Sequence, residues 1–255
     1  MSKNNDTFGK TLGVVIGLCL VCSVIVSGAA VALKPLQDAN IKLDKQKYLL
    51  QAAGYETTGD VGATYEKHIE ARLVDLKSGD YVAGDAEAFD QAKAAREAAT
   101  STLVADDAGS KVKRVPNTAQ VYLVKDEAGQ VTSIILPIKG AGLWSTMYAF
   151  LALETDMNTV KSLVYYEQGE TAGLGSEIQN PTWMALWPGK KVYNQDGEIA
   201  LAVAKPNPSL DAMNQVDALS GATLTGNGVT NSIHFWLGEE AFGNYIAKVR
   251  QGGLE

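Results

Sequence analysis

Hydrophobic residues are most concentrated near the N-terminus, in an uncharged stretch from Thr11 to Leu33 that lies between Lys10 and Lys34. An α-helix rises about 1.5 Å per residue, so these 23 residues are long enough to cross the roughly 30 Å hydrocarbon layer of a membrane. A cleaved signal peptide is the alternative, but the apolar core of such a peptide usually has only about 7–15 residues. We therefore expect a retained transmembrane anchor over residues 11–33, preceded by residues 1–10. The lysines on both sides of the span do not decide its orientation.

The pattern becomes more polar after this span. Residues 34–55 mix charged and apolar positions, as a charged stalk that continues into a helix would. The segment Asp85–Thr100 is rich in alanine with interspersed glutamate and lysine, which are good helix formers, so it predicts another helix. We expect residues 34–115 to form a stalk and the helical N-terminal part of a soluble domain.

From Ala119 onward the hydrophobic positions alternate with a period of two, which is typical of β-strands. The runs Ala119–Val124 and Val131–Ile138 lie on either side of Ala128 and Gly129, which are suited to a tight turn. This arrangement predicts a β-hairpin.

Further strands and a closing helix are expected toward the C-terminus. Thr159–Gln168 and Lys190–Ala204 are strand-like, whereas Asn231–Gln251 carries its aromatic residues on one helical face. The pattern as a whole predicts an α+β fold: one N-terminal transmembrane helix, followed by a soluble domain with a mainly antiparallel twisted sheet flanked by helices. We place the main body of that domain at residues 116–255.

Composition and charge narrow the possible functions. A chain of 255 residues, 46% of them hydrophobic, can bury a sizeable core in one large or two small domains. Its net charge of −7 argues against nucleic-acid binding, because neutralising phosphate backbones requires clustered Lys and Arg side chains.

The two cysteines, Cys19 and Cys22, form a Cys-x-x-Cys pair inside the apolar span. Nothing nearby supplies further metal ligands, so two small polarizable residues in a membrane helix are a better interpretation than a redox or metal pair. Ser23 stands where a c-type haem site requires histidine. With His68 and His234 as the two histidines of the chain, we expect no metal site and no thiol chemistry in the soluble part.

Three glycine-bearing stretches follow strand-like runs: Lys139–Ser145, Glu167–Glu177 and Asp217–Thr225, called here the first, second and third glycine stretches. Glycine lets backbone amides approach a ligand closely, and consecutive amides can bind an anion. None of the stretches matches a P-loop or a Rossmann fingerprint, and each taken singly is typical of a plain turn. Their joint occurrence points to a shared site.

Together, the three stretches resemble the FMN-binding domain of the NqrC family, whose members are subunits of the sodium-translocating NADH:quinone oxidoreductases, and the resemblance extends over essentially the whole chain. The residues that carry it are Asp217, Ser220, Gly221, Ala222, Thr223, Gly142, Leu143, Trp144, Glu170, Thr171, Gly173, Leu174 and Gly175. Ala172 stands where this family usually has proline. The resemblance implies that residues 116–255 bind FMN and that Thr223, which ends the Ser-Gly-Ala-Thr motif, carries it through a phosphoester.

The residues themselves fit this chemistry. Gly221 and Ala222 are small enough to admit a phosphate beside the chain. A threonine hydroxyl is a weak nucleophile without a base, and Asp217 is the one ionisable group nearby in sequence. The resemblance therefore implies attachment by a separate flavin transferase, with Asp217 as part of what that enzyme recognises. Trp144 and Leu174 are candidates for contact with the isoalloxazine, although Trp144 could equally be a core residue.

The resemblance also implies a place in a complex. The chain has no dinucleotide fingerprint, so we expect the flavin, and no catalytic side chain or metal of this chain, to carry electrons. The implied partners are the membrane and the other subunits of the oxidoreductase, which are designated A, B, D, E and F. The implied location is the bacterial inner membrane, with a single span, residues 1–10 in the cytoplasm and the soluble domain in the periplasm.

Alternatives remain for the attachment residue and for the function. Ser220, Thr225 and Thr230 compete with Thr223 on composition alone. A second Gly-Ala-Thr, at residues 62–64, lacks the preceding hydroxyl and is interpreted as a coincidence. The competing functions are the flavoprotein subunit of the related Rnf complex and a non-redox binding module on a membrane stalk. The long segment from Leu43 to Thr100, expected to be helical, favours the sodium-pump subunit over the Rnf subunit.

Overall fold

The structure is a computed structural model that describes residues 8–105, 107–206 and 211–253. It contains two compact units, which divide between Lys45 and Gln46. The first unit is the larger part of helix α1 (Phe8–Ala53), and the last turns of that helix belong to the second unit.

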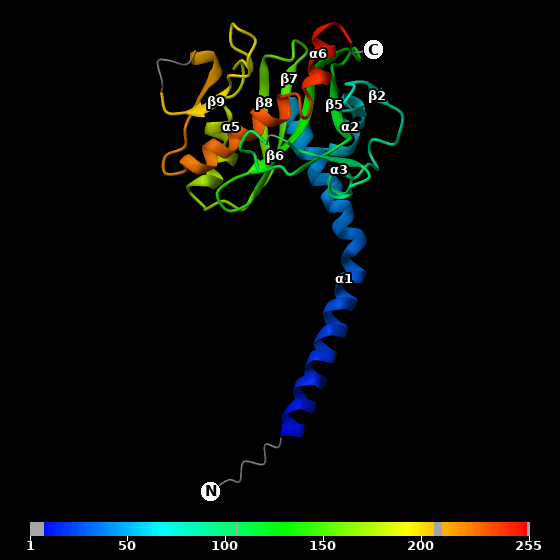
Figure 1. Ribbon diagram of the computed structural model, residues 1–255. Helices are drawn as coiled ribbons and strands as arrows, with labels where there is room; N and C mark the ends of the chain where they lie inside the picture. Colours follow the sequence, from blue (N-terminus) through cyan, green and yellow to red (C-terminus); the bar gives the residue numbers. More distant parts are fainter. Residues whose placement is uncertain (1–7, 106, 207–210, 254–255) are drawn as a thin grey trace. The chain divides into compact units, whose positions relative to one another are not determined.

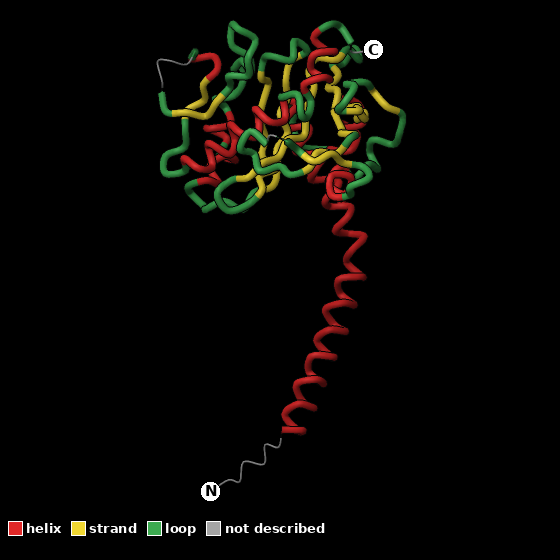
Figure 2. Tube along the Cα trace, in the orientation of Figure 1, coloured by secondary structure: helices red, strands yellow, loops and turns green. Residues whose placement is uncertain are grey.

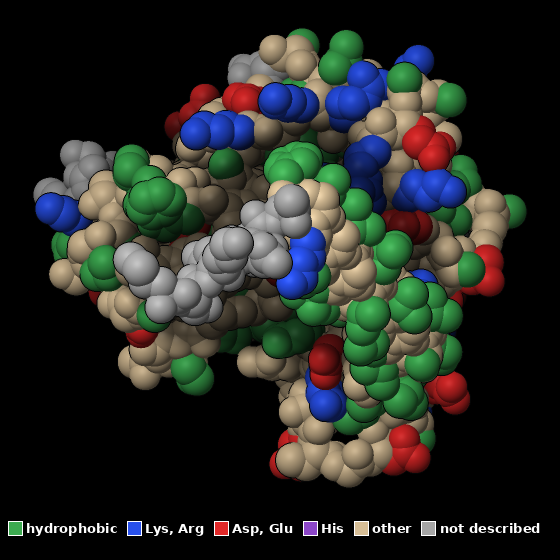
Figure 3. Space-filling model, turned by 90° about the horizontal axis from the view of Figure 1, so that it is seen from below, with side chains coloured by type: hydrophobic (Ala, Val, Ile, Leu, Met, Phe, Trp, Pro, Cys, Tyr) green, Lys and Arg blue, Asp and Glu red, His purple; other side chains and the backbone are tan. Residues whose placement is uncertain are grey.

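Helix α1 contains the whole predicted span and continues without interruption through the predicted stalk (Figure 1). Among the described residues, it is the one helix long and apolar enough to cross a membrane. Its apolar side chains from Leu12 to Leu33 are exposed. Figure 3, which views the molecule from below, shows hydrophobic side chains gathered on the visible surface. A helix that exposes this much apolar surface requires an apolar environment to cover it.

The second unit is built on a six-stranded antiparallel sheet in the order β2-β1-β5-β6-β7-β8 (Figures 1 and 2). The strands are β1 (Ile69–Asp75), β2 (Tyr81–Val82), β5 (Thr118–Lys125), β6 (Val131–Ala141), β7 (Thr146–Glu154) and β8 (Val160–Glu167). The predicted hairpin is confirmed as β5 and β6, with Tyr122 opposite Ile135. The mainly antiparallel α+β fold predicted from the sequence is therefore correct.

The two faces of the sheet bury different cores, because successive side chains of a strand point to opposite faces. Ile134 belongs to the core that includes residues of α5 (Thr223–Leu237) and α6 (Gly243–Arg250). Ile135, its neighbour on β6, belongs to the core formed with the end of α1 and with α2 (Val61–His68). Both isoleucines are completely buried, so the sheet is covered by helices on both faces.

Short elements connect these layers. They are α3 (Gln91–Arg96), β3 (Ser101–Leu103), β4 (Arg114–Pro116), the 3-10 helix η1 (Gly175–Gln179), α4 (Pro181–Met184), β9 (Ala202–Ala204), the 3-10 helix η2 (Ala212–Asn214) and β10 (Gln215–Asp217). Strands β9 and β10 pair in parallel, with Val216 opposite Val203. This small parallel pair leads directly into the third glycine stretch.

The helix predicted over Asp85–Thr100 is wrong except for α3, which covers six residues. Asp90 caps the start of α3, since its carboxylate accepts a hydrogen bond from Lys93 N at 2.8 Å. The Thr100 hydroxyl donates to Ala94 O at 2.8 Å and turns the chain after the helix. The segment 34–115 is also not mainly helical. It contains several short strands besides its helices, and one of them, β1, pairs with β5 inside the sheet.

Two further differences lie toward the C-terminus. Lys190–Ala204 is mostly irregular, and β9 is the one regular strand within it, because Lys191 N donates to Met213 O of η2 and Val192 N donates to Asn158 O in the loop before β8. The closing helix is two helices, and α5 begins at Thr223 rather than near Asn231. The break occurs at Gly238, whose carbonyl accepts hydrogen bonds from the amides that start the next turn.

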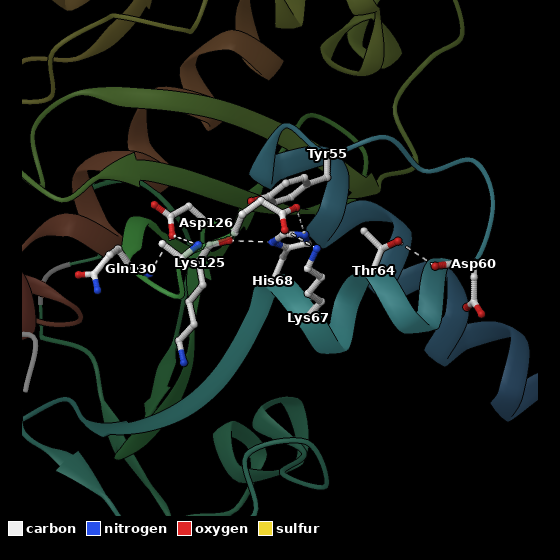
Figure 4. Close-up of polar contacts among 10 residues, drawn as sticks. Tyr55, Asp60, Thr64, Lys67, His68, Lys125, Asp126 and Gln130 are labelled. Atoms are coloured by element: carbon white, nitrogen blue, oxygen red, sulfur yellow. Dashed lines mark hydrogen bonds and ion pairs between the residues drawn. The ribbon is translucent and has the colours of Figure 1, made fainter.

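Hydrogen bonds connect the chain that follows α1 to the end of β5, next to the turn between β5 and β6 (Figure 4). The Tyr55 hydroxyl donates to Lys125 O at 2.8 Å, and His68 Nδ1 lies 2.9 Å from the same oxygen. The Tyr55 and His68 rings stack with their centroids 4.2 Å apart. Asp126 accepts from Gln130 N at 2.9 Å and closes the turn itself.

Burial on both faces of the sheet predicts the effect of core truncation. Replacing either Ile134 or Ile135 with Ala leaves a cavity in one of the two cores, so each change should lower the free energy of unfolding by about 2–5 kcal/mol. Denaturant titration of the full chain in detergent, followed by tryptophan fluorescence, measures this quantity. Thr132→Ala, at an exposed position of β6, is the matched control and should change it by less than about 0.5 kcal/mol. A stability loss from one isoleucine alone would contradict the two-sided core.

Candidate functional site

The carboxylate of Glu170 joins the first and second glycine stretches. Its Oε2 accepts a hydrogen bond from Leu143 N at 3.0 Å, and its Oε1 accepts from Trp144 N at 2.9 Å and Ser145 N at 3.2 Å. The Ser145 hydroxyl in turn accepts from Gly169 N at 2.7 Å. The loop between β6 and β7 is therefore wrapped around one carboxylate from the segment after β8.

The same carboxylate reaches the third stretch. Thr225 Oγ1 donates to Glu170 Oε2 at 2.6 Å, and both residues are buried, with exposed fractions of 1% and 9%. Burial opposes ionisation of the carboxyl, but the hydrogen bonds from Thr225 and from the three loop amides outweigh it, so the pKa of Glu170 lies below its usual value. One anionic group thus connects segments that are distant along the chain.

Glycine is required where the stretches approach this carboxylate. A Cβ atom on Gly142 would lie 2.5 Å from Glu170 Oε1, and one on Gly175 would lie 2.6 Å from Thr225 Oγ1. Gly221, in the Ser-Gly-Ala-Thr motif, has a φ of +73°, and a Cβ there would lie 3.0 Å from Leu174 Cδ2. The motif is therefore packed against the second glycine stretch.

Thr223 is the first residue of α5 and is exposed. The residue before it, Ala222, makes no side-chain capping hydrogen bond, and the first turn contains no acidic residue. The first amides of a helix have no partner within the helix, and the helix dipole makes this end positive. The Thr223 hydroxyl thus lies at an uncapped helix N-terminus, which is a favourable place for a phosphate.

The four candidate hydroxyls differ in their surroundings. Thr225 is buried and bonded to Glu170, as described above. Thr230 is half-buried, donates to Gly226 O at 3.2 Å and accepts from Val203 N at 2.9 Å. Ser220 and Thr223 are exposed, so two of the four hydroxyls are accessible to a modifying enzyme.

Large apolar side chains are exposed on the loops that Glu170 holds together. Trp144 is 71% exposed, Leu143 49% and Leu174 43%, and Leu224 next to Thr223 is 58% exposed. Trp144 is therefore not a core residue. Exposed apolar groups brought together from separate segments are typical of a surface that contacts a ligand or a partner.

The remaining predicted residues lie at the edges of this arrangement. Asp217 is exposed at the end of β10, and its backbone oxygen accepts a hydrogen bond from Trp183 Nε1 at 2.8 Å. Thr171 and Gly173 are exposed in the second stretch, where Gly173 N donates to Ser176 Oγ at 3.1 Å. The second Gly-Ala-Thr lies elsewhere, in α2, where the Thr64 hydroxyl donates to Asp60 O at 2.9 Å (Figure 4).

Sequence reasoning does not identify how three residues organise the site: Ser145, Thr225 and Trp183. On composition Thr225 is a candidate for the attachment residue, whereas its hydroxyl is occupied by Glu170. Trp183 has no sequence feature that sets it apart from a core tryptophan, yet its indole holds the strand that precedes the motif. No local signal marks these roles, because each depends on a contact across the fold. Within the part of the chain that the structure describes, no group of three or more His, Cys, Asp and Glu residues is arranged to hold a metal ion.

Comparison with known proteins identifies the family of this chain. The FMN-binding domain family matches residues 142–238, which include the loop of the first stretch, the second and third stretches and helix α5. NqrC of the Na(+)-translocating NADH-quinone reductase of Vibrio alginolyticus is 50% identical over 256 residues, a match that covers all of both chains. The corresponding protein of Pasteurella multocida is 49% identical, covering 100% of this chain and 99% of its own.

Solved structures show the same fold. The crystal structure of Shewanella oneidensis NqrC superposes with a TM-score of 0.79 at 33% identity, covering 84% of this chain and 99% of that one. The structure of the equivalent subunit from Parabacteroides distasonis has a TM-score of 0.67 at 29% identity and covers 84% and 96%. With half of its residues identical to a relative matched from end to end, the chain belongs to the NqrC family of Na(+)-translocating NADH-quinone reductase subunits.

Proposed function

We propose that this chain is the membrane-anchored flavoprotein subunit of a sodium-translocating NADH:quinone reductase, and that it carries FMN covalently as a phosphoester on Thr223. The observation that carries the proposal is the position of Thr223, an exposed hydroxyl at the uncapped N-terminus of α5 inside the region that matches the FMN-binding domain family. Ser220 is also exposed, but it precedes the helix and does not end the Ser-Gly-Ala-Thr motif.

The residues present fit a flavin phosphate. An anion at a helix N-terminus is favoured by about 0.3–1 kcal/mol through the helix dipole, and the free amides of the first turn can donate to its oxygens. Gly221 adopts a left-handed backbone conformation that side chains rarely tolerate, and Ala222 adds one methyl group, so the turn leaves room beside Thr223. Asp217 lies outside this turn, where a transferase could recognise it.

The exposed apolar residues fit the flavin ring. Leu143, Trp144 and Leu174 are available to pack against it, with backbone amides around Thr171, Gly173 and Gly175 near its polar edge. When bound, FMN supplies the electron transfer, and the chain supplies position and electrostatics. Glu170 acts as the positioning residue, because its carboxylate is already occupied by donors of this chain.

In this proposal the chain works inside a complex. A single apolar helix anchors it in the inner membrane, the soluble unit faces the periplasm, and electrons enter and leave through cofactors of the other subunits. A separate flavin transferase loads the cofactor, since the structure places no general base on Thr223 within the described residues. The match of the full chain to NqrC proteins supports this assignment over the related Rnf subunit.

The attachment residue is tested by three valine or alanine substitutions. Thr223→Val removes the hydroxyl and keeps the shape, so covalent flavin should be lost while the fold remains. Ser220→Ala and Thr225→Val should each keep an FMN adduct on Thr223, although Thr225→Val leaves Glu170 short of one donor and should lower stability by about 1–3 kcal/mol. Fluorescence of the denatured chain in gels and peptide mass spectrometry measure the adduct. An adduct at any other residue would refute the assignment.

The role of Glu170 predicts a dependence on pH. Its folded-state pKa is lowered, so its contribution to stability is complete at neutral pH and is lost as the pH falls from the ordinary glutamate pKa through the folded value. Glu170→Gln should remove part of this acid dependence and lower stability at pH 7, since the amide group cannot accept all four hydrogen bonds. Urea titrations of both proteins between pH 7 and acid pH check this. Parallel stability curves for the two proteins would contradict the role.

The orientation is tested in intact cells. Protease added to spheroplasts should digest the unit that begins at Gln46, because a periplasmic domain is accessible once the outer membrane is opened. A cytoplasmic marker protein serves as the control for intact membranes. Protection of the domain until the cells are lysed would place it on the other side.

A further inference from the structure

A cavity of about 390 Å³ in the second unit is lined by positive side chains. It lies between α3, the segment that leads into β4, and the ends of β6 and β7. Five of its lining residues are cationic: Arg96, Lys111, Lys113, Arg114 and Lys139. We call this cavity the basic cavity. None of its lining residues is acidic, although the whole chain carries a net charge of −7.

Among the residues that the structure describes, no acidic side chain neutralises these five cations. No described carboxylate lies within ion-pair distance of any of them. Burial and the nearby charge of Arg96 lower the pKa of Lys139, which is half-buried in the cavity. Positive groups held together without a counter-charge repel one another, and a bound anion would relieve this repulsion.

Two of the five cationic side chains are held by hydrogen bonds to other described residues, and three are not. The Arg114 guanidinium donates to Ser101 Oγ and to Ser101 O, both at 2.8 Å, and Arg96 Nε donates to Ala92 O at 3.1 Å. The ammonium groups of Lys111, Lys113 and Lys139 make no hydrogen bond to any described residue. These three groups are therefore available to an outside ligand.

The backbone holds Lys111 in a constrained position. Its φ is +58°, in the left-handed region that non-glycine residues rarely adopt. Ser110 maintains this corner, because Ser110 O accepts from Ala141 N at 2.9 Å and Ser110 Oγ accepts from Val112 N at 3.2 Å. The corner is therefore tied directly to β6.

The basic cavity is continuous with the loop proposed to contact the flavin. Ala141 and Thr146 line the cavity, pair with each other at the end of the β6–β7 hairpin, and bracket the loop that contains Trp144. A partner seated in the cavity would therefore lie beside that loop. Electron exchange between proteins requires such a close approach at the cofactor.

We propose that the basic cavity docks a carboxylate-bearing segment of a partner protein in the electron-transfer chain. The proposal rests on the proposed function, because docking here serves a flavin carried next to the loop. Charge complementarity with the available lysines selects an acidic partner, and electrostatic attraction speeds association and fixes its register. A protein partner is favoured over a lipid surface because the chain belongs to a family of complex-forming subunits and the cavity adjoins the flavin loop.

Cross-linking in the assembled complex tests the contact directly. A water-soluble carbodiimide joins a carboxylate to a lysine amine as an amide, with net loss of water, when the two are in contact. We expect Lys111, Lys113 or Lys139 to be joined to Asp or Glu of another subunit, as mapped by peptide mass spectrometry. The proposal is overturned if exposed lysines such as Lys77 and Lys205 form links to other subunits and these three form none.

Charge reversal tests the consequence for electron transfer. Lys111→Glu with Lys113→Glu should slow NADH-driven reduction or reoxidation of this chain's flavin roughly tenfold at about 0.01 M ionic strength, and the difference should shrink at about 0.15 M. Lys77→Glu with Lys205→Glu makes the same change in net charge at exposed positions outside the cavity, and should alter the rate by less than about twofold. Equal rates in the two variants would overturn the proposal.

Two controls separate the possible failures. In-gel fluorescence shows whether the variants keep covalent flavin; an unmodified wild-type chain refutes the proposed function, whereas a flavinylated complex without the cross-link refutes the docking site alone. Reconstitution in vesicles of neutral phosphatidylcholine or of anionic phosphatidylglycerol identifies a lipid ligand. A rate loss that appears in the anionic vesicles and not in the neutral ones would overturn docking of a protein carboxylate.

Discussion

The arrangement of the site depends on the hydrogen bonds made to the buried carboxylate of Glu170. This carboxylate accepts hydrogen bonds from three amides of the β6–β7 loop and from the Thr225 hydroxyl near the start of α5. A charge taken out of water is tolerated when several donors replace its hydration, and charge-assisted hydrogen bonds are stronger than neutral ones. The same contacts that stabilise the anion therefore determine where the exposed Trp144 and Thr223 lie.

The sheet and its helices give this network a firm base. Strands β6 and β7 pair along nearly their whole length up to Ala141 and Thr146, and α5 packs across β6. Gly140 and Gly228 permit this close packing, since a Cβ on Gly228 would lie 2.2 Å from Ala141 O. Loops carried by paired strands and a packed helix hold side chains more precisely than free loops do. The site is thus assembled from loops, but their ends are positioned by the core.

The net charge of the chain does not show where its charged residues lie in the structure. The net charge of −7 gives no sign of the basic cavity, which gathers five cations beside the β6–β7 loop. Average composition says nothing of where the charges lie, because α3, β4, β6 and β7 bring distant segments together. The apolar surface is uneven too: most of the large exposed hydrophobic residues belong to α1, and a smaller group surrounds the site.

The sequence alone determined the features that depend on residues close together along the chain. An uncharged run predicted helix α1, a period of two predicted the β5–β6 hairpin, and the three glycine stretches were recognised by their residues. Tertiary structure decided the features that depend on distant contacts: β1 joined the sheet by pairing with β5, and the predicted helix over Asp85–Thr100 shortened to α3. The contact between Glu170 and Thr225 could not be predicted, because local periodicity carries no information about which buried donor will meet a carboxylate 55 residues away.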